Sequence, residues 1–384
     1  MKNKTKNSSQ KSIKKSSKKN KKKLIEVRTS KKKTVRLVDI AKRVGVAVST
    51  VSRILNGTPN NVKLTEETKK KVFAVASELG YASFHIPVKY HQGMRSVMVI
   101  SYDPGEIFYQ KIISAIEQTV RAKGYACYFS YTEGDPRQAS ELIDAMSERF
   151  TSGCVIFQNK NEVFTPKNKL KLQNLNIPCV VVDQHPIPKP DFISTVQLDN
   201  EKAGYDLASH LLRLGHRNFA FLSIEKSSSC PERKKGLEKR LAQAGLELDP
   251  TFVADVDVDA RFKLFDIFKS WISGKKPFPT AIVTVHDLIG YAVLNVLENM
   301  GFKIPEDISI ASFDDRVEMV PWVYDNIKIP LTSIRQPIEA IGKAVGEELI
   351  ARIIDSKRKP EHIRLKGELI IRSSTAKPRQ SLKP

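Results

Sequence analysis

Hydrophobic positions between residues 37 and 57 recur at the spacing of two short helices, with a tight break at Gly45. The first helix has one apolar stripe, made of Leu37, Ile40, Ala41 and Val44. The second buries Val51, Ile54 and Leu55 and leaves a small, mostly polar face exposed. This pattern is typical of a helix-turn-helix, a module that places its second helix in the major groove of DNA. An ordinary amphipathic helical hairpin is the alternative interpretation.

From Ser96 the pattern changes to short apolar strands that alternate with amphipathic helices. Strands are expected at 97–101, 126–131, 153–158, 178–183, 196–198, 218–223, 251–255, 281–285 and 308–313. Helices are expected between many of them, at 108–123, 138–150, 201–214, 232–244, 288–300 and 338–354. Nearly continuous apolar strands separated by helices predict parallel sheets with helices on both faces. The length suits two sheets of about six strands, with a ligand bound beyond the strand ends in an interlobe cleft.

These patterns divide the chain into five parts. A third helix is expected to begin near Leu64 and to end at Gly80. The parts are a disordered basic tail (1–33), a helix-turn-helix DNA-binding domain (34–81), a hinge linker (82–95), a two-lobed core (96–376) and a C-terminal tail (377–384). The N-lobe is expected at about 96–196 and 316–356, and the C-lobe at about 197–315 and 357–376. The predicted fold is therefore a small all-α helix-turn-helix headpiece joined to an α/β core of two doubly wound parallel-sheet lobes.

Positive charge is concentrated near the N-terminus. The formal net charge of the 384 residues is +22, and residues 1–33 hold 15 Lys and Arg against one acid, Glu26. Residues 34–95 hold 10 Lys and Arg against 4 acids, which leaves +2 for the rest of the chain. A basic end on a near-neutral body is the electrostatic signature of a nucleic-acid-binding protein. The Lys/Ser/Asn-rich tail is interpreted as a non-specific DNA arm, with a solvating arm or an artefact of start-codon choice as alternatives.

Several other classes of protein are not supported by the sequence. The charged start is not followed by the apolar segment of a secretory signal, and no run of about 18 apolar residues suggests a membrane span. The spacing of the four cysteines (Cys127, Cys154, Cys179 and Cys230) is not that of metal ligands, so we expect no metal site. Isolated cysteines indicate a reducing compartment, so we expect the protein in the cytoplasm. Motifs such as GxGxxG, HExxH and GxSxG are missing, and the histidines are scattered. We therefore expect neither an enzyme nor a cofactor.

Seven segments in order resemble the LacI/GalR family of transcriptional regulators, from about residue 36 to residue 376. They are VDIAKRVGVAVSTVSRILNG, FYQKIISAIEQTVRAKGY, IPCVVVDQ, VQLDNEKAGYDLASHLLRLGHRNFAFLS, VHDLIGYAVLNVLENMGFKIPEDISIASFDD, LTSIRQP and LIIRSSTA. The resemblance implies a homodimeric repressor that reads a pseudo-palindromic operator. It also implies a periplasmic-binding-protein-like core that holds a small effector, a sugar or sugar derivative. The alternative is a solute-binding protein without specific DNA binding, but such proteins lack a helix-turn-helix.

The resemblance assigns DNA contacts to one helix. Val48, Ser49, Ser52 and Arg53 fall where the family's recognition helix meets bases. The fork of Arg53 suits guanine O6 and N7, although a phosphate contact or a solvated charge is the alternative. Thr50 is expected to contact phosphate, and Asn56 to close the helix end or to contact the DNA backbone.

The linker departs from the family pattern at two positions. Tyr90 occupies the place of a leucine that relatives insert into the minor groove, and Pro87 stands where alanine is usual. A proline is tolerated in the first turn of a helix but breaks its interior. A hinge helix that begins at Pro87 and weaker bending of DNA are both consistent with this change. Tyr90 is either a partial intercalator or an exposed linker residue.

The resemblance also places effector contacts in the cleft. Arg233 and Asp287 fall on family positions that bind the ligand, and an interlobe salt bridge between them is the alternative. Together they suit a polyhydroxylated ligand held by charge-assisted hydrogen bonds. His286 replaces a more usual Asn, and Phe108 and Tyr109 either line the cleft or belong to the core. Whether the effector releases DNA or strengthens its binding is left open by the sequence.

Overall fold

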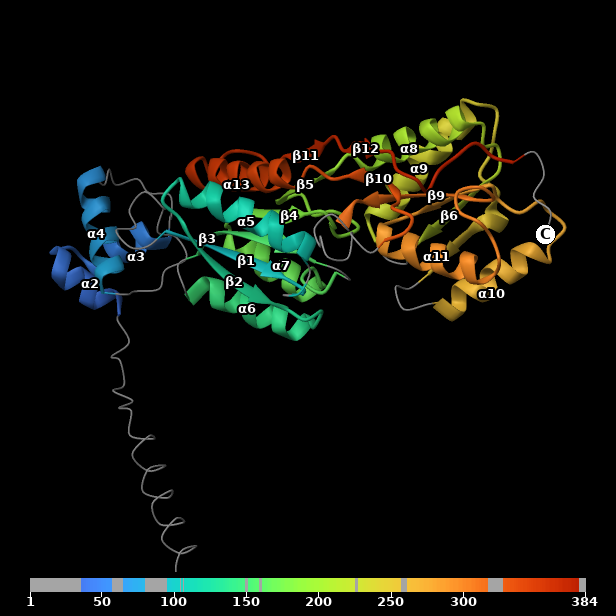
Figure 1. The fold of residues 1–384 in the computed structure, drawn as a ribbon. Helices are drawn as coiled ribbons and strands as arrows, with labels where there is room; N and C mark the ends of the chain where they lie inside the picture. The colour runs from blue at the N-terminus through green and yellow to red at the C-terminus, as the bar shows by residue number, and fades with distance from the viewer. Residues whose placement is uncertain are drawn as a thin grey trace, which may run out of the picture. The chain divides into compact units, whose positions relative to one another are not determined.

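The computed structural model describes residues 36–56, 65–79, 95–103, 105, 107–148, 151–158, 161–224, 227–256, 261–316 and 327–379. The chain divides into two compact units, Met1–His85 and Ile86–Pro384 (Figure 1). The expected tail 1–33 lies outside the described residues, as does all of the expected linker except Arg95. The predictions about Pro87 and Tyr90 therefore stay predictions.

The first unit contains three short helices, α2 (Leu37–Val44), α3 (Val48–Asn56) and α4 (Glu66–Glu78). Gly45 ends α2 in the left-handed conformation, with φ 77°, and its N–H donates to the carbonyl of Ala41 at 3.0 Å. A glycine adopts this conformation without strain, which explains the tight break. Apolar side chains of all three helices meet in one small core, made of Ile40, Ala41, Val51, Ile54, Leu55, Val72, Phe73 and Ala76. The helix-turn-helix prediction is confirmed.

The second unit contains two six-stranded sheets, and the first has the order β11-β5-β4-β3-β1-β2 with all strands parallel. Its strands are β1 (Ser96–Ser101), β2 (Ala126–Tyr131), β3 (Thr151–Phe157), β4 (Cys179–Val182), β5 (Ile193–Leu198) and β11 (His362–Leu365). Helices α5 (Ile107–Arg121) and α13 (Ile338–Ile354) pack on one face, and α6 (Pro136–Glu148) and α7 (Pro166–Leu175) on the other. Alternate residues of each strand, such as Val97 and Met98, belong to opposite cores.

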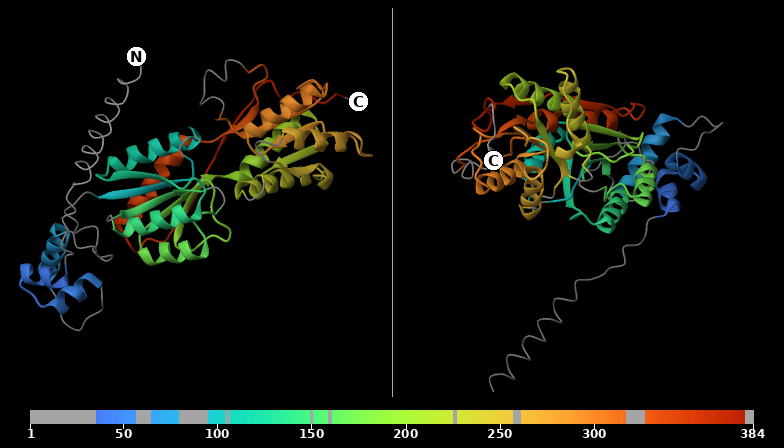
Figure 2. Two further views of the ribbon diagram at one scale, coloured as in Figure 1. Left: turned by 90° about the horizontal axis from the view of Figure 1, so that it is seen from below. Right: turned by 90° about the vertical axis from the view of Figure 1, so that its right-hand side faces the viewer.

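The second sheet repeats this plan with the order β12-β10-β9-β8-β6-β7. Its strands are β6 (Phe219–Ser223), β7 (Val253–Asp255), β8 (Ala281–Thr284), β9 (Ser309–Asp314), β10 (Thr332–Arg335) and β12 (Glu368–Ile370). Helices α8 (Asn200–Leu214) and α9 (Ser229–Ala242) cover one face, and α10 (Arg261–Ile272) and α11 (Asp287–Asn299) the other (Figure 2). A one-turn helix, η2 (Pro250–Phe252), leads into β7. The α/β core of two doubly wound lobes is confirmed, although β12 pairs antiparallel with β10.

The exchange of strands between the lobes differs from the expected boundaries. β10 pairs with β9 and so belongs to the second lobe, whereas residues 316–356 were expected in the first. β11 pairs with β5 and so belongs to the first lobe, whereas residues 357–376 were expected in the second. The chain therefore crosses between lobes after β5, between β10 and α13, and between β11 and β12. We call the last two segments the crossovers.

Two glycines allow α8 and α9 to lie in close contact. A Cβ atom on Gly204 would overlap the carbonyl oxygen of Arg233, and one on Gly236 would overlap that of Glu201. In both cases the neighbour is backbone, which cannot rotate away as a side chain would. The small residues thus set the position of α9, which carries Arg233.

We predict that Gly236→Ala lowers the free energy of unfolding by about 1–3 kcal/mol or more, because the added methyl forces two helices apart. The sign of this change in stability is informative, because replacing glycine with alanine in a helix interior otherwise stabilises a protein by about 0.5–1 kcal/mol. Urea unfolding of the whole protein measures the change. Gly274→Ala is the matched control, because its Cβ would lie no nearer than 3.3 Å to any neighbouring atom. Equal stability of the two variants would contradict the close packing.

Candidate DNA-binding surface and interlobe site

The polar face of α3 is open to solvent. Val48, with 42% of its surface exposed, lies on this face with Ser49 and Arg53, which are also exposed. Thr50 and Ser52 are half-buried on its flanks, and the side chain of Asn56 lies outside the description. The opposite face holds the buried residues of the small core. The structure thus brings the predicted base-reading residues together on one accessible helix surface.

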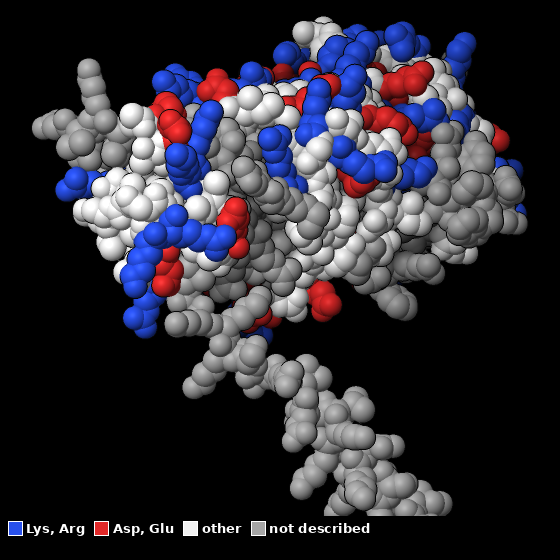
Figure 3. Space-filling view, turned by 90° about the vertical axis from the view of Figure 1, so that its left-hand side faces the viewer, with Lys and Arg blue, Asp and Glu red and all other residues white. Residues whose placement is uncertain are grey.

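Basic side chains are not gathered in a single patch on the face that Figure 3 shows. Figure 3 shows one face of the molecule, on which described Lys and Arg side chains lie interspersed with Asp and Glu. Several form exposed ion pairs, such as that of Arg43 with Glu78 at 3.1 Å. Such pairs contribute little to stability, about 0–1 kcal/mol. The basic excess found in the sequence lies in residues 1–33 and 34–95, much of it outside the described residues.

Acidic residues directly follow the carboxyl ends of central strands in both lobes. Asp183 follows β4, Asp314 ends β9, and Asp287 begins α11 just after β8. Asp183 and Asp314 both have a left-handed backbone, with φ 62° and 89°. Such conformations are strained in residues other than glycine and concentrate at functional sites. With Tyr109, Arg233 and Arg316, these three acids form what we call the interlobe site.

Asp183 belongs to the first lobe, as Tyr109 does, and was not identified from the sequence. The hydroxyl of Tyr109 donates to its Oδ2 at 3.1 Å, while its buried Oδ1 has no hydrogen-bond partner among the described residues. Burial raises the pKa of Asp183, and the charge of Asp314 raises it further, against the opposing effect of Arg233. A buried carboxylate oxygen without a donor is an available acceptor for a ligand hydroxyl.

Arg233 is held by three partners within its own lobe. Its Nε donates to Asn200 Oδ1 at 2.8 Å, its Nη1 to the carbonyl of Val285, and its Nη2 to Asp314 Oδ1 at 2.8 Å. The ring of Phe313 lies 4.7 Å from the guanidinium carbon. A guanidinium has five N–H donors, so two make no hydrogen bond within the described part of the chain.

The sequence analysis expected Arg233 and Asp287 to bind one ligand together, with a salt bridge between the two residues as the alternative. Arg233 makes its ion pair with Asp314, and no hydrogen bond or ion pair joins Arg233 to Asp287 among the described residues. Both partners of the observed pair belong to the second lobe, so the alternative of an interlobe salt bridge is wrong for Arg233, and the shared ligand stays a prediction. The sequence offers no signal for this pairing, since the two residues are 81 positions apart.

Asp287 is 1% exposed and carries a proton at neutral pH. Burial raises its pKa to about 8, and the charge of Asp314 adds to the effect. The backbone N–H of Arg316 donates to its Oδ2 at 2.6 Å, but Oδ1 has no partner among the described residues. The protonated carboxyl can therefore both donate and accept a hydrogen bond at this oxygen.

His286 caps α11. Its Nδ1 accepts a hydrogen bond from the N–H of Ile289 at 3.3 Å, which satisfies one of the free donors of the first turn. Burial lowers its pKa to about 4, and the positive charge of Arg316 lowers it further. The neutral ring is thus engaged by its own helix, in a role that the sequence prediction of an effector contact did not include.

Phe108 and Tyr109 are both core residues and parts of the interlobe region. Phe108 is buried in the first lobe, and the guanidinium of Arg316 from the second lobe lies 5.0 Å from its ring centroid. Such a cation–π contact ties the two lobes together. Tyr109 packs against Phe157 with ring centroids 5.0 Å apart while its hydroxyl reaches Asp183. The core alternative is therefore confirmed for both residues, and a contact with an effector stays a prediction.

A second set of polar contacts joins the lobes, and we call it the latch. The amide of Gln184, just after β4, accepts from the N–H of Ser228 at 2.8 Å and donates to Ser229 Oγ at 3.0 Å. Ser227 Oγ donates to the same amide oxygen at 3.1 Å, and the N–H of His185 donates to Ser228 Oγ at 3.0 Å. The latch connects the loop after Asp183 with the start of α9, four residues before Arg233. Any movement between the lobes must stretch it.

Metal chemistry finds no support in the described residues, where no group of three or more His, Cys, Asp and Glu could hold an ion. Within the same residues, no helix combines the length and the apolarity that crossing a membrane requires.

His216 has a structural role. Its ring is buried between Thr280, Ser309 and Ala376 and makes hydrogen bonds of 2.9–3.0 Å with them.

We predict that Asp287→Asn is increasingly more stable than the wild type as pH rises from about 4 to 8. The folded protein holds the Asp287 proton up to a pKa of about 8, whereas the unfolded chain releases it near the ordinary value of 3.8. Between these values the folded state binds more protons, so the wild type loses stability as pH rises and the amide does not. Urea unfolding at pH 4.5 and 8.5 measures the difference.

Asp191→Asn is the control for the pH experiment. Asp191 is an exposed carboxyl of the first lobe, so its removal corrects for the general effect of one lost negative charge. A stability difference between Asp287→Asn and the wild type that is equal at both pH values would contradict the buried, protonated carboxyl.

The comparisons with known proteins cover most of the chain. Residues 36–83 match the family described as bacterial regulatory proteins, lacI family, and residues 208–375 match a periplasmic binding protein-like domain. The chain is 28% identical over 346 residues to the HTH-type transcriptional repressor PurR of Aliivibrio fischeri (strain MJ11), with 88% of this chain and 97% of the relative covered. It is 27% identical over 347 residues to the HTH-type transcriptional regulator DegA of Bacillus subtilis (strain 168), with 88% and 98% covered.

A solved structure shows the same fold. The structure of a transcriptional regulator CelR–cellobiose complex matches with a TM-score of 0.62 at 24% identity, and the match covers 88% of this chain and 99% of that one. The family is one of transcriptional regulators and not of enzymes, in agreement with the sequence prediction. With a lacI-type helix-turn-helix followed by a periplasmic-binding-protein-like core, this chain belongs to the LacI family of bacterial transcriptional regulators.

Proposed function

We propose that this protein is a repressor that binds its operator through the exposed face of α3 and is controlled by an effector bound at the interlobe site. The observation that carries the proposal is the accessible face of α3, on which Ser49 and Arg53 stand beside Val48. A short helix with small side chains and one arginine can enter the major groove closely. Arg53 then grips guanine O6 and N7, while Ser49 and Ser52 contact neighbouring base edges. Thr50 and Asn56 are proposed to contact the DNA backbone.

The proposal includes a homodimer. One recognition helix reads only a few base pairs, whereas paired headpieces read two half-sites about one helical turn apart. Exposed apolar side chains on the second lobe support a subunit interface there, namely Phe265 and Ile272 on α10 and Leu288 on α11. Phe129 on the edge strand β2 offers a similar surface on the first lobe. Large apolar side chains exposed to water in this way are typical of interaction surfaces.

The effector is proposed to be a sugar or sugar derivative. Among the described residues, buried oxygens of Asp183 and Asp287 from opposite lobes have no hydrogen-bond partner, and the positive charge of Arg233 acts on Asp183. A polyhydroxylated molecule supplies both donors and acceptors to such groups, and each pairing removes an unsatisfied polar atom.

Binding of one molecule by both lobes links the site to DNA. A ligand that contacts Asp183 and Asp287 at once favours one arrangement of the lobes, and the arrangement of the lobes governs how the paired headpieces meet the half-sites. A coupling free energy of about 1–3 kcal/mol changes operator affinity by roughly 5–150-fold. The effector releases DNA if the lobe arrangement that it favours differs from the one needed for operator binding. It strengthens DNA binding if the two arrangements are the same.

We predict that Arg53→Ala lowers affinity for an operator selected from randomised DNA by about 1–3 kcal/mol, while non-specific binding changes little. The loss should map to one base pair of each half-site. Fluorescence anisotropy with operator and with scrambled DNA measures both affinities. Lys42→Ala is the control, since it removes one exposed positive charge from the neighbouring α2. Lys42→Ala should weaken binding to operator and to scrambled DNA equally. If Arg53→Ala also weakened binding to the two DNAs equally, Arg53 would contact phosphate and not a base.

We predict that a sugar or sugar derivative raises the melting temperature of the whole protein and that Asp183→Ala weakens its binding at least tenfold. A ligand that binds only the folded state stabilises it by mass action, so a panel of sugars, sugar phosphates and nucleosides identifies the class. Asp191→Ala provides a matched control, because it removes an exposed carboxyl from the same lobe. Identical affinities of the two variants, with both folded, would refute the proposed contact.

A further inference from the structure

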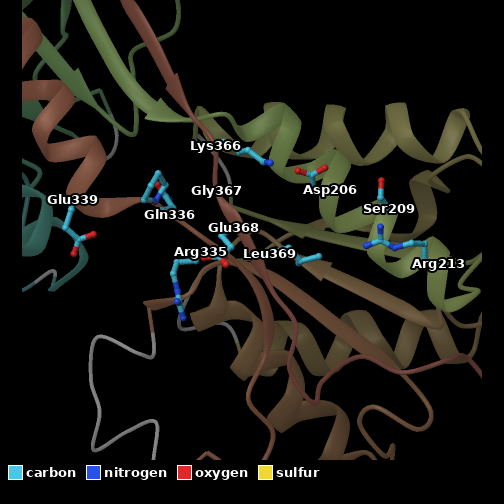
Figure 4. A pocket seen from close by; sticks show the side chains of 11 residues that line it. Asp206, Ser209, Arg213, Arg335, Gln336, Glu339, Lys366, Gly367, Glu368 and Leu369 are labelled. Atoms are coloured by element: carbon cyan, nitrogen blue, oxygen red, sulfur yellow. The ribbon is translucent and has the colours of Figure 1, made fainter.

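A pocket of about 680 Å³ lies beside the two crossovers, and we call it the crossover pocket (Figure 4). Asp206, Ser209 and Arg213 line it from one side of α8, and Gln336 and Lys366 line it from the crossovers. Its lining includes none of the six residues of the interlobe site. A volume of this size holds a small organic molecule. It is therefore a separate cavity at the segments about which the lobes are joined.

The crossover pocket presents charges of both signs. Arg213 and Lys366 are exposed and basic, while Asp206 and Glu368 are acidic. In Figure 4 the side chain of Lys366 points toward Asp206, and Arg213 lies further along the same helix. Asp206 already pairs with Lys202, one turn earlier on α8. The acidic side chains would repel a simple anion, and the basic side chains would repel a simple cation. A molecule that carries one charge of each sign can pair with both kinds of side chain.

Gln336 adds a buried, unsatisfied group to the lining. The residue is 3% exposed, and its Nε2 donates to Asp314 Oδ1 at 2.8 Å. Its Oε1 is buried and has no hydrogen-bond partner among the described residues. A buried acceptor without a donor costs free energy, which a ligand N–H removes. The same side chain thus touches the crossover pocket and, through Asp314, the interlobe site.

We propose that the crossover pocket binds a small zwitterion, an amino acid or a short peptide. Its carboxylate lies between Arg213 and Lys366, where two positive charges are available. Its ammonium group faces Asp206 and the Oε1 of Gln336. Charge-assisted hydrogen bonds at both ends orient the molecule across the crossovers.

A ligand in this pocket also acts on the interlobe site. It fixes the amide of Gln336, which bonds the carboxylate that pairs with Arg233. It further bridges α8 of the second lobe to the segments that lead into α13 and out of β11. Occupancy of the crossover pocket therefore changes the affinity of the interlobe site for its effector. This coupling rests on the proposed function, whereas binding to the pocket does not.

The test is calorimetric titration of the full chain with L-glutamate, L-lysine and glycylglycine at constant ionic strength. The wild type should bind at least one of them, and Arg213→Gln/Lys366→Gln should bind it at least tenfold more weakly. Arg217→Gln/Lys303→Gln is the matched control, because it removes the same two charges from exposed positions of the same lobe outside the pocket. Citrate and putrescine, each with charge of one sign, should bind poorly. Melting curves establish that both double variants are folded.

Three results would overturn the proposal. They are no binding of the three zwitterions to the wild type, equal affinity in the pocket variant and the wild type, and binding of citrate or putrescine as tight as that of the zwitterions. The coupling has its own readout, a change of at least twofold in effector affinity when the zwitterion is present. An unchanged effector affinity refutes the coupling and leaves binding to the pocket supported. Failure to find any effector refutes the proposed effector site alone, since calorimetry of the zwitterion needs neither effector nor DNA.

Discussion

The buried ion pair of Arg233 with Asp314 is the interaction on which the arrangement of the interlobe site depends. Their side chains are 2% and 5% exposed, so neither charge is stabilised by water. Removing one partner of such a pair typically costs about 3–5 kcal/mol, because the other charge is left buried alone. Burial alone would raise the pKa of Asp314, but Arg233 and Arg316 outweigh it and hold that pKa below its ordinary value. The pair therefore persists and fixes α9 against the ends of β8 and β9.

The other ionisable groups of the site adjust to this pair. Asp287 and Asp183 both have raised pKa values, partly because Asp314 is already negative nearby, and His286 is neutral because burial and Arg316 oppose its protonation. The site thus holds the charged groups Asp314, Arg233 and Arg316 beside the neutral groups Asp287 and His286. The pKa of Asp183 lies above its ordinary value. Among the described residues, one buried oxygen of Asp183 and one of Asp287 have no hydrogen-bond partner, and a ligand hydroxyl can meet each of them.

Local patterns in the sequence predicted most helices and strands well. They did not predict which strands, far apart in the sequence, pair with one another. The expected helix 338–354 coincides with α13, because its apolar spacing and length are unambiguous. The short strands β10, β11 and β12 were missed, and with them the true lobe boundaries, since three or four residues carry no clear period and their lobe is decided by the strand they pair with. α7 and α10 were also missed, the former because only Asn168 and Leu172 of its residues are buried. Within the interlobe site, the positions of Asp183 and Asp314 at the ends of apolar strands were a usable signal in the sequence. The pairing of Arg233 with Asp314 had no such signal.

The distribution of cores explains where movement can occur. Each sheet is covered on both faces by helices with fully buried contacts, so each lobe behaves as a rigid body. The contacts between lobes are of another kind. They include the polar latch around Gln184, the bonds of Glu232 with Gln197 and Arg364, the cation–π contact of Arg316 with Phe108, and three chain crossings. Hydrogen bonds of this type exchange for others at small net cost, whereas a packed core resists deformation. A ligand that adds a few polar contacts between the lobes therefore competes on equal terms with what holds them, which is the condition for a small molecule to shift their arrangement.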